Sequence, residues 1–114
     1  MHTLVIINDP PYGTERVYNG LRLAQAMLKH GAVTVFLMAD AVSSARAGQK
    51  TPDGYYNVER MLKRLIAGDG KILLCGTCMD ARGLDDAAIV TGARRSTLEE
   101  LANTTAAADK TLVF

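Results

Sequence analysis

Short runs of apolar residues recur along the chain, and they restrict its possible folds more than any other feature of the sequence. They span Thr3–Asn8, Ala32–Met38, Lys71–Cys75 and Thr111–Phe114. Within each run the apolar residues follow one another instead of alternating with polar ones, a pattern typical of strands buried on both faces. We therefore expect four strands in a parallel sheet.

Helical periodicity fills the segments between these runs. We expect Thr14 to cap a first helix, with Glu15 in its first turn and Gly31 as its stop. Asn57 is expected to cap a second helix, because the residues after it have the most regular spacing in the sequence. Its apolar stripe follows the pattern i, i+3, i+4, i+7, i+8 and consists of Val58, Met61, Leu62, Leu65 and Ile66.

Two weaker helical segments complete this interpretation. A short helix is expected over Ala41–Arg46, followed by a loop over Ala47–Tyr56. Ser96-x-x-Glu99 matches the capping box that opens a helix. The segment Gly76–Leu84 is expected to be a loop or a short helical turn.

Strands that alternate with helices imply right-handed crossovers and helices on both faces of a sheet. We therefore predict an α/β fold: a three-layer sandwich with an open, mainly parallel sheet of four or five strands. No repeat, linker or biased tract divides the sequence, so residues 1–114 are expected to form one domain.

Composition excludes several classes of function. Thirteen basic and twelve acidic residues leave a net charge of +1, and aromatic residues make up 5% with no Trp. Direct nucleic-acid binding, which uses clustered cations or base-stacking aromatics, is not expected. The apolar run Leu4–Ile7 is shorter than a signal sequence or a membrane helix requires. We expect a cytoplasmic protein with no membrane partner.

The carboxyl edge of a parallel sheet is where ligands bind in such folds. Asn8–Gly13, Ala39–Val42 and Cys75–Gly83 all leave strands at that edge, so function is expected where they converge. Cys75-Gly76-Thr77-Cys78 places both cysteines of the chain there. Turn amides and the positive end of a following helix lower the pKa of a thiol at this position. Arg82 is expected to add positive charge.

Two chemistries need such a thiolate: thiol–disulfide exchange and carriage of a sulfane sulfur as a persulfide. The alternative is that Cys75, the last residue of an apolar strand, is a buried small hydrophobe. A strand-end CxxC is also the local signature of thioredoxin-like proteins. Their fold places a cis-proline after the motif, whereas Pro10, Pro11 and Pro52 all precede it here.

Other residues give less specific signals. His2 and His30 lie in different elements, so no zinc site is expected. Without a phosphate-binding glycine motif we expect no bound cofactor. The loop Asp9–Gly13 is stiffened by two prolines, and Tyr12 or the loop backbone is expected to wall the thiol pocket. The charged groups Asp80, Asp85, Asp86, Arg94 and Arg95 are expected to be solvated, although the arginines can attract an anionic sulfur compound.

These residues together resemble the DsrE/DsrF-like (YchN-like) family over almost the whole chain. The resemblance rests on Ile7–Gly13, Leu21–Ala24, Val35–Val42 and above all Cys75–Leu84. It implies that Cys75 is the sulfur acceptor and that Cys78 is an additional thiol.

The resemblance also implies a cytoplasmic subunit of a homo-oligomer, a trimer or hexamer, that exchanges a persulfide with protein donors and acceptors. On this hypothesis the chain is a sulfur carrier of the sulfurtransferase type. The residues expected to support Cys75 and Cys78 are Gly76, Thr77, Arg82, Gly83, Asn8, Pro11, Tyr12 and Asp40. A CxxC redox protein and a non-catalytic oligomeric module with inert cysteines remain the alternatives.

Overall fold

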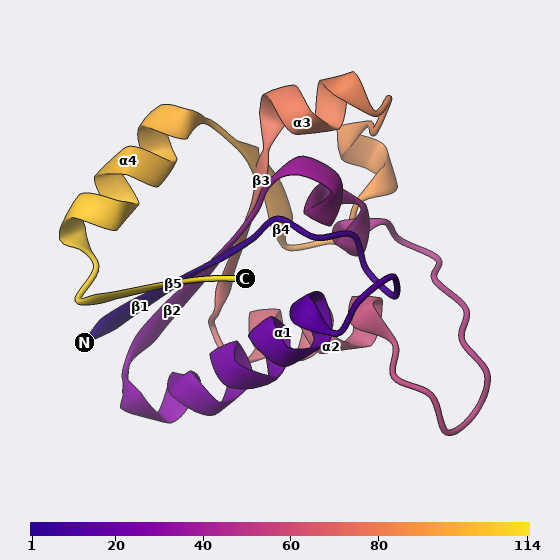
Figure 1. Ribbon diagram of the computed structural model, residues 1–114, viewed down its shortest axis with the longest axis horizontal. Helices are drawn as coiled ribbons and strands as arrows, with labels where there is room; N and C mark the ends of the chain where they lie inside the picture. Colours follow the sequence, from indigo (N-terminus) through magenta and orange to yellow (C-terminus); the bar gives the residue numbers. More distant parts are fainter.

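A five-stranded sheet forms the centre of the computed structural model, which describes residues 1–114 (Figure 1). Every neighbouring pair of strands is parallel, and the order across the sheet is β4-β3-β2-β1-β5. β3, which ends in the first cysteine, is therefore an interior strand. The strands are β1 (His2–Ile7), β2 (Ala32–Leu37), β3 (Lys71–Cys75), β4 (Ala93–Ser96) and β5 (Lys110–Val113).

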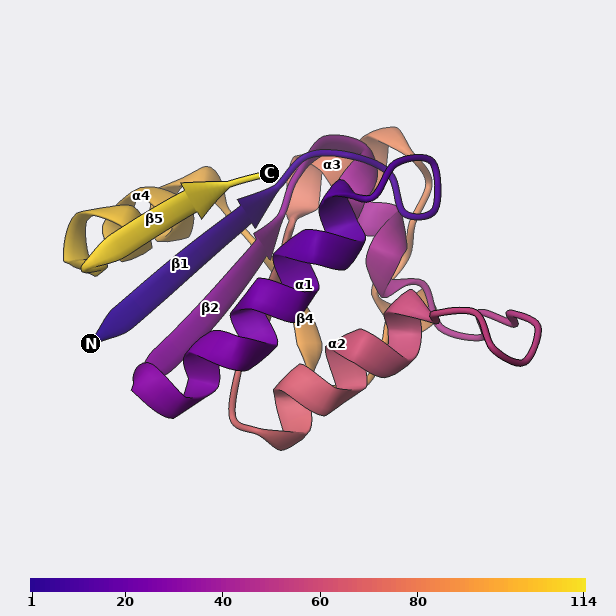
Figure 2. The same ribbon diagram turned by 60° about the horizontal axis from the view of Figure 1, so that its bottom comes forward.

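Helices cover both faces of this sheet. α1 and α2 lie side by side on one face and α4 lies on the other (Figures 1 and 2), while α3 and η2 pack together beyond the carboxyl ends of the strands. No helix is long and apolar enough to cross a membrane. The α-helices are α1 (Arg16–Met27), α2 (Val58–Ala67), α3 (Gly76–Ala81) and α4 (Leu98–Ala107), and the 3-10 helices are η1 (Leu28–His30), η2 (Ala39–Ala45) and η3 (Asp86–Ala88).

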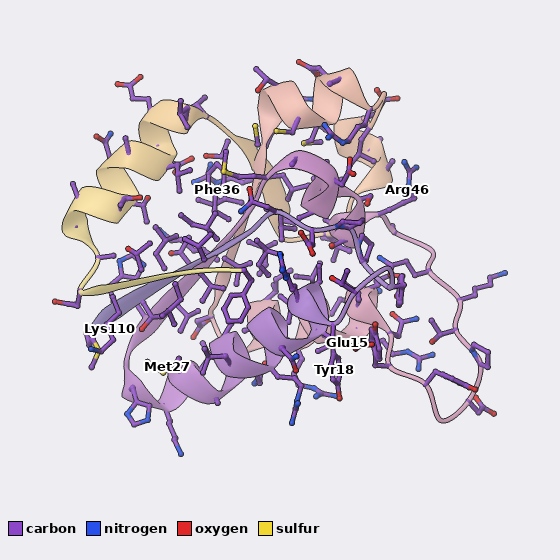
Figure 3. The ribbon with its side chains drawn as sticks, viewed as in Figure 1. Glu15, Tyr18, Met27, Phe36, Arg46 and Lys110 are labelled. Atoms are coloured by element: carbon purple, nitrogen blue, oxygen red, sulfur yellow. The ribbon has the colours of Figure 1, made fainter.

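The predicted α/β fold is confirmed, because the sheet is parallel throughout and helices cover both of its faces. Its interior strands β1, β2 and β3 coincide with three of the predicted apolar runs to within one residue. The core lies on both sides of the sheet: Phe36 of β2 is buried on the side opposite α1, which carries Met27 (Figure 3). On the α1 side, Leu62 and Leu65 of α2 are fully buried. Burying one such side chain stabilises a fold by about 1.5–3 kcal/mol.

The ends of two helices confirm the sequence predictions. The side chain of Asn57 accepts the backbone N–H of Arg60 at 3.0 Å, so it caps α2 as expected. Gly31 ends the α1–η1 segment with φ +141°, and a Cβ there would lie 2.0 Å from the carbonyl oxygen of Met1. Only glycine fits that backbone position without a shift of the N-terminal strand.

The predicted start of α1 is wrong. The helix begins at Arg16, and Glu15 rather than Thr14 is its N-cap residue, without a side-chain cap. The turn after β1, in which Tyr12 has a φ of +67° in the left-handed region, therefore extends one residue further than predicted. The Thr14 hydroxyl donates to Asp9 at 3.0 Å within this turn.

The capping box was predicted one residue too early, and the edge strand β4 was not predicted. Ser96 is the last residue of β4, and Thr97 is the N-cap of α4, where its side chain accepts the N–H of Glu100 at 3.1 Å. β4 lies at the sheet edge and contains Arg94 and Arg95. A short, charged edge strand has neither a continuous apolar run nor a clear alternation, so the sequence pattern did not indicate it.

The remaining differences are small. The short helix predicted over Ala41–Arg46 is a 3-10 helix over Ala39–Ala45. β2 ends one residue earlier than predicted, and β5 begins one residue earlier. These changes leave the order of the predicted elements unaltered, with β4 and η3 as additions between α3 and α4.

Candidate functional site

Cys75 joins the end of β3 to the start of α3. Its Sγ accepts the backbone N–H of Cys78 at 3.4 Å, so the cysteine side chain itself caps the helix. The hydroxyl of Thr77 lies 3.3 Å from the same sulfur and can donate to it. Cys75 as a whole is 8% exposed. The sulfur is therefore held by donors on one side and has limited access to solvent.

The two thiols differ in how readily they ionise. Burial raises the pKa of Cys75, but hydrogen bonds from Cys78 and Thr77 outweigh it, so the pKa of Cys75 is lowered overall. Burial and the hydrogen bond to Cys75 raise the pKa of Cys78, and the Ala39 N–H and the charge of Arg82 only partly offset this. Cys75 therefore ionises first, and Cys78 keeps its proton.

Cys78 is held by the neighbouring segment. Its Sγ accepts the N–H of Ala39 at 3.2 Å, which links α3 to η2. Arg82 donates to the Oδ1 of Asp40 at 2.7 Å and to the carbonyl oxygen of Cys78 at 3.1 Å. Two of the three segments expected to meet at the carboxyl edge, those after β2 and β3, are thus in direct contact.

This geometry corrects the role predicted for Arg82. Its charge lowers the pKa of Cys78, whereas none of the causes that shift the pKa of Cys75 involves Arg82. The amide of Gly76 is likewise not a donor to the Cys75 sulfur, because the donors are the Thr77 and Cys78 amides and their side chains. The backbone turns after Cys75, and these amides are the ones that reach back to it.

A pocket of about 410 Å³ opens beside Cys75. Cys75 and Thr77 form part of one side, and the chain from Ser96 to Leu98 forms another. Cys75 and Ser96 are register partners in the β3–β4 pair, which explains why the strand-end residues face the same space. Leu98 is 69% exposed and leaves an apolar group at the edge of the pocket.

Arg95 also lines this pocket, whereas the sequence indicated only that it can attract an anionic sulfur compound. Its guanidinium donates to the Gly76 carbonyl oxygen, to Asp80 and to Asp86, each at 2.9 Å. A Cβ at Gly76 would lie 3.0 Å from both the Arg95 Cγ and the Ser96 carbonyl oxygen, so this position is closely packed. Arg95, Asp80 and Asp86 form an ion-pair cluster at the surface, and the two carboxylates are solvated as predicted, with side chains 69% and 67% exposed.

Several predicted site residues lie away from this pocket. The backbone N–H of Asn8 bonds to the carbonyl oxygen of Phe114 at 2.9 Å, on the β5 side of β1. Pro11 lies in the turn after β1 and does not line the pocket. Gly83, at φ +61°, follows α3 in the left-handed region with open space around it.

The prediction that Tyr12 walls the thiol pocket is wrong. Its hydroxyl donates to Gln49 and accepts the N–H of Val58 at 2.9 Å, and its ring stacks on Tyr56. β2 lies between β1 and β3 in the sheet, so the turn that leaves β1 is one strand further from Cys75 than the sequence suggested.

No group of three or more His, Cys, Asp or Glu side chains gathers anywhere in the chain to share a metal ion. His2, which was considered as a zinc ligand, bonds instead to the Thr34 hydroxyl at 2.9 Å.

The fold and the site define a small parallel α/β protein with a low-pKa cysteine at the carboxyl end of an interior strand. Comparison with known proteins narrows this class. The chain belongs to the DsrE/DsrF-like family, whose model matches residues 1–114. This family is associated with sulfur relay.

Individual relatives cover nearly the same length. The protein YchN of Escherichia coli K12 is 40% identical over 114 residues, which is 97% of each chain. The uncharacterized protein MK0008 of Methanopyrus kandleri is 34% identical over 111 residues, covering 96% of this chain and 91% of that one. The crystal structure of E. coli YchN superposes with a TM-score of 0.91 at 42% identity and covers all of both chains.

Proposed function

We propose that this protein carries sulfane sulfur as a persulfide on Cys75. The observation that supports this most directly is the pairing of a lowered pKa at Cys75 with an open pocket of about 410 Å³ beside it. The thiolate is the nucleophilic form of cysteine, so a lowered pKa increases the reactive fraction near neutral pH. The association of the family with sulfur relay supports the same chemistry.

The loading step is a displacement at sulfur. The Cys75 thiolate attacks the outer sulfur of a donor persulfide, a bond forms between the two sulfurs, and the S–S bond of the donor breaks. The donor leaves as a thiolate, and Cys75 becomes a persulfide anion. The Thr77 hydroxyl and the Cys78 N–H, which hold the thiolate, are placed to stabilise the charged product as well.

Cys78 supplies a route for release or protection. Once deprotonated, its thiolate attacks the inner sulfur of the persulfide, a Cys75–Cys78 disulfide forms and hydrosulfide leaves. The raised pKa of Cys78 keeps this reaction slow while the carrier is loaded. An acceptor thiolate that attacks the outer sulfur instead regenerates the Cys75 thiolate.

Intact-protein mass spectrometry after treatment with polysulfide tests the proposal. We expect a mass increase of one sulfur atom on the wild type and on Cys78→Ser, with a longer lifetime on the variant because the release route is absent. Cys75→Ser should not gain the sulfur. An equal gain on Cys75→Ser, or none on the wild type, would contradict the proposal.

Thiol–disulfide exchange through the CxxC is a second candidate, which the side-chain hydrogen bond between Cys75 and Cys78 favours. It predicts that a Cys75–Cys78 disulfide forms with oxidised glutathione alone. It also predicts that the reduced Cys75–Cys78 dithiol reduces a protein disulfide such as that of insulin and becomes the disulfide itself. Slow iodoacetamide labelling of the native protein at Cys75 would instead favour the third reading, an oligomeric module with inert cysteines.

We further propose the setting that the family resemblance implies. The chain is a single domain that assembles as a homo-oligomer, a trimer or hexamer, in the cytoplasm and exchanges sulfur with other proteins. Light scattering of the purified protein measures the oligomeric state directly, and a monomer would contradict this part of the proposal.

A further inference from the structure

A groove between α1 and α2 has no part in the thiol site. The two helices lie on the face of the sheet opposite α4 (Figure 2). The groove between them consists of two adjoining hollows of about 260 and 370 Å³. Both hollows are bordered by Arg22, Met61 and Arg64, so they form one continuous space. Its combined size is in the range of small-molecule sites.

The cations of this groove have no carboxylate partner. Arg22, Arg60 and Arg64 line it, no acidic residue does, and none of these arginines forms an ion pair. Elsewhere in the chain the arginines that do pair with carboxylates are Arg16, Arg82, Arg94 and Arg95. On a chain of net charge +1, three unpaired arginines in one groove are a local concentration of positive charge.

A column of aromatic rings holds one of these arginines in place. Tyr56 stacks between Tyr12 and Tyr18, with ring centroids 5.5 and 4.3 Å apart. The guanidinium of Arg22 lies over the ring of Tyr18 at 5.2 Å and donates to Asn19 at 3.3 Å. Tyr18 lies on the outer side of α1 (Figure 3). Arg22 is therefore pre-positioned with its charge uncompensated.

The smaller hollow combines an apolar side with an unsatisfied acceptor, and we call it the apolar hollow. Leu21, Ala26 and Met61 form its apolar side, and Gln25, Arg22 and Arg64 complete its lining. The Oε1 of Gln25 is buried and has no hydrogen-bond partner. A buried acceptor without a donor costs free energy, so a ligand that donates a hydrogen bond there gains more than it would at an exposed site.

We propose that this groove binds a nucleotide. The planar base, with its amino group, occupies the apolar hollow and donates to Gln25, and the phosphates meet Arg22, Arg60 and Arg64. Arginine suits phosphate because its planar guanidinium offers several donors in a fixed arrangement. An inorganic anion would use the arginines but not the apolar hollow.

Calorimetric titration at low ionic strength separates these components. ADP is the probe, pyrophosphate carries the phosphates without the base, and adenosine carries the base without the phosphates. We expect ADP to bind at least about tenfold more tightly than either fragment, and to bind more weakly as salt is added.

Matched variants locate the binding. Arg60→Gln and Arg64→Gln should each weaken the binding of ADP about tenfold. Arg46 is a matched control, because it is an exposed arginine that lies outside the groove and forms no ion pair. Arg46→Gln should leave the affinity for ADP unchanged. Gln25→Leu should weaken ADP but not pyrophosphate. Since this change also removes a buried unpaired acceptor, a loss of affinity will not reflect a loss of folding, which thermal melting checks.

Several results would overturn the proposal. These are no ADP binding at low salt, equal binding of ADP and pyrophosphate, or equal losses in Arg46→Gln and the groove variants. Tighter binding of an oligonucleotide than of ADP would replace the nucleotide by a nucleic acid as the ligand. None of these measurements depends on Cys75, so the result stands apart from the sulfur-carrier proposal.

Discussion

Glu100, in the first turn of α4, forms an ion pair and a hydrogen bond with residues of β4 beside the Cys75 pocket. Its carboxylate accepts two hydrogen bonds from Arg94, at 2.8 and 2.6 Å, and one from the Ser96 hydroxyl. The hydrogen bonds from Arg94, followed by that from Ser96, lower the pKa of Glu100 from 4.5 to about 2. Replacing Glu100 by Gln keeps its shape and removes the charge that these donors stabilise.

The size of the effect follows from this pKa and from exposure. One pKa unit corresponds to about 1.4 kcal/mol, so a fully shielded carboxylate with this pKa would stabilise the fold by roughly 3 kcal/mol. The Glu100 and Arg94 side chains are 36% and 55% exposed, and solvent screens their attraction. We therefore expect Glu100→Gln to lower the free energy of unfolding at neutral pH by about 1–2 kcal/mol.

The stabilisation by Glu100 depends on pH in a definite direction. Because the folded-state pKa is below the unfolded value, the stabilisation is complete above about pH 4.5 and is lost as pH falls towards about 2. Urea unfolding followed by far-ultraviolet circular dichroism should show the wild type and Glu100→Gln converging at low pH. Glu99→Gln, which removes a neighbouring charge without an ion pair, should cost less than about 0.5 kcal/mol.

A gap between wild type and Glu100→Gln that is the same at neutral and at low pH would refute this reasoning. So would an equal loss in Glu99→Gln, because the effect would then come from net charge and not from this contact.

Three further predictions concern the site and the core. Thr77→Val should raise the pKa of Cys75 and move the pH profile of its alkylation to higher pH, while Thr77→Ser keeps the wild-type profile; no movement in Thr77→Val would remove the hydroxyl from the account. Asn57→Ala should lower the free energy of unfolding by about 1 kcal/mol in urea titration, since it removes the α2 cap, and an unchanged midpoint would argue against that cap. Leu62→Ala should cost about 2–5 kcal/mol in the same assay because it leaves a cavity in a fully buried position, and a loss below this range would mean that the core collapses around the gap.

The interior strands of this sheet could be predicted from the sequence, because burial on both faces requires a continuous run of apolar residues. β1, β2 and β3 have continuous apolar runs, and α2 has a regular apolar stripe, so both were identified. β4 has no such apolar run. Its arginines point into charged contacts at the sheet edge, where a strand needs only backbone pairing with one neighbour.

The residues of the candidate site could also be predicted only where they depend on the interior strands. Cys75, Cys78, Asp40 and Arg82 lie together as expected, because neighbouring parallel strands end at the same edge. The sequence did not place Arg95 beside Gly76, because the position of Arg95 depends on β4, which was not predicted. The error at Tyr12 has a different origin: local sequence indicates that a segment leaves the sheet at this edge, but not how many strands separate it from the cysteine.

The tyrosine column also determines which part of this molecule its near-ultraviolet spectra and fluorescence report on. The chain has four tyrosines and no tryptophan, and three of the tyrosines stack in that one column. Near-ultraviolet dichroism and intrinsic emission therefore come mostly from the junction of the N-terminal turn with the groove. A compound bound against Arg22 should alter this signal, whereas a sulfur atom added to Cys75, two strands away from the turn after β1, should leave it unchanged.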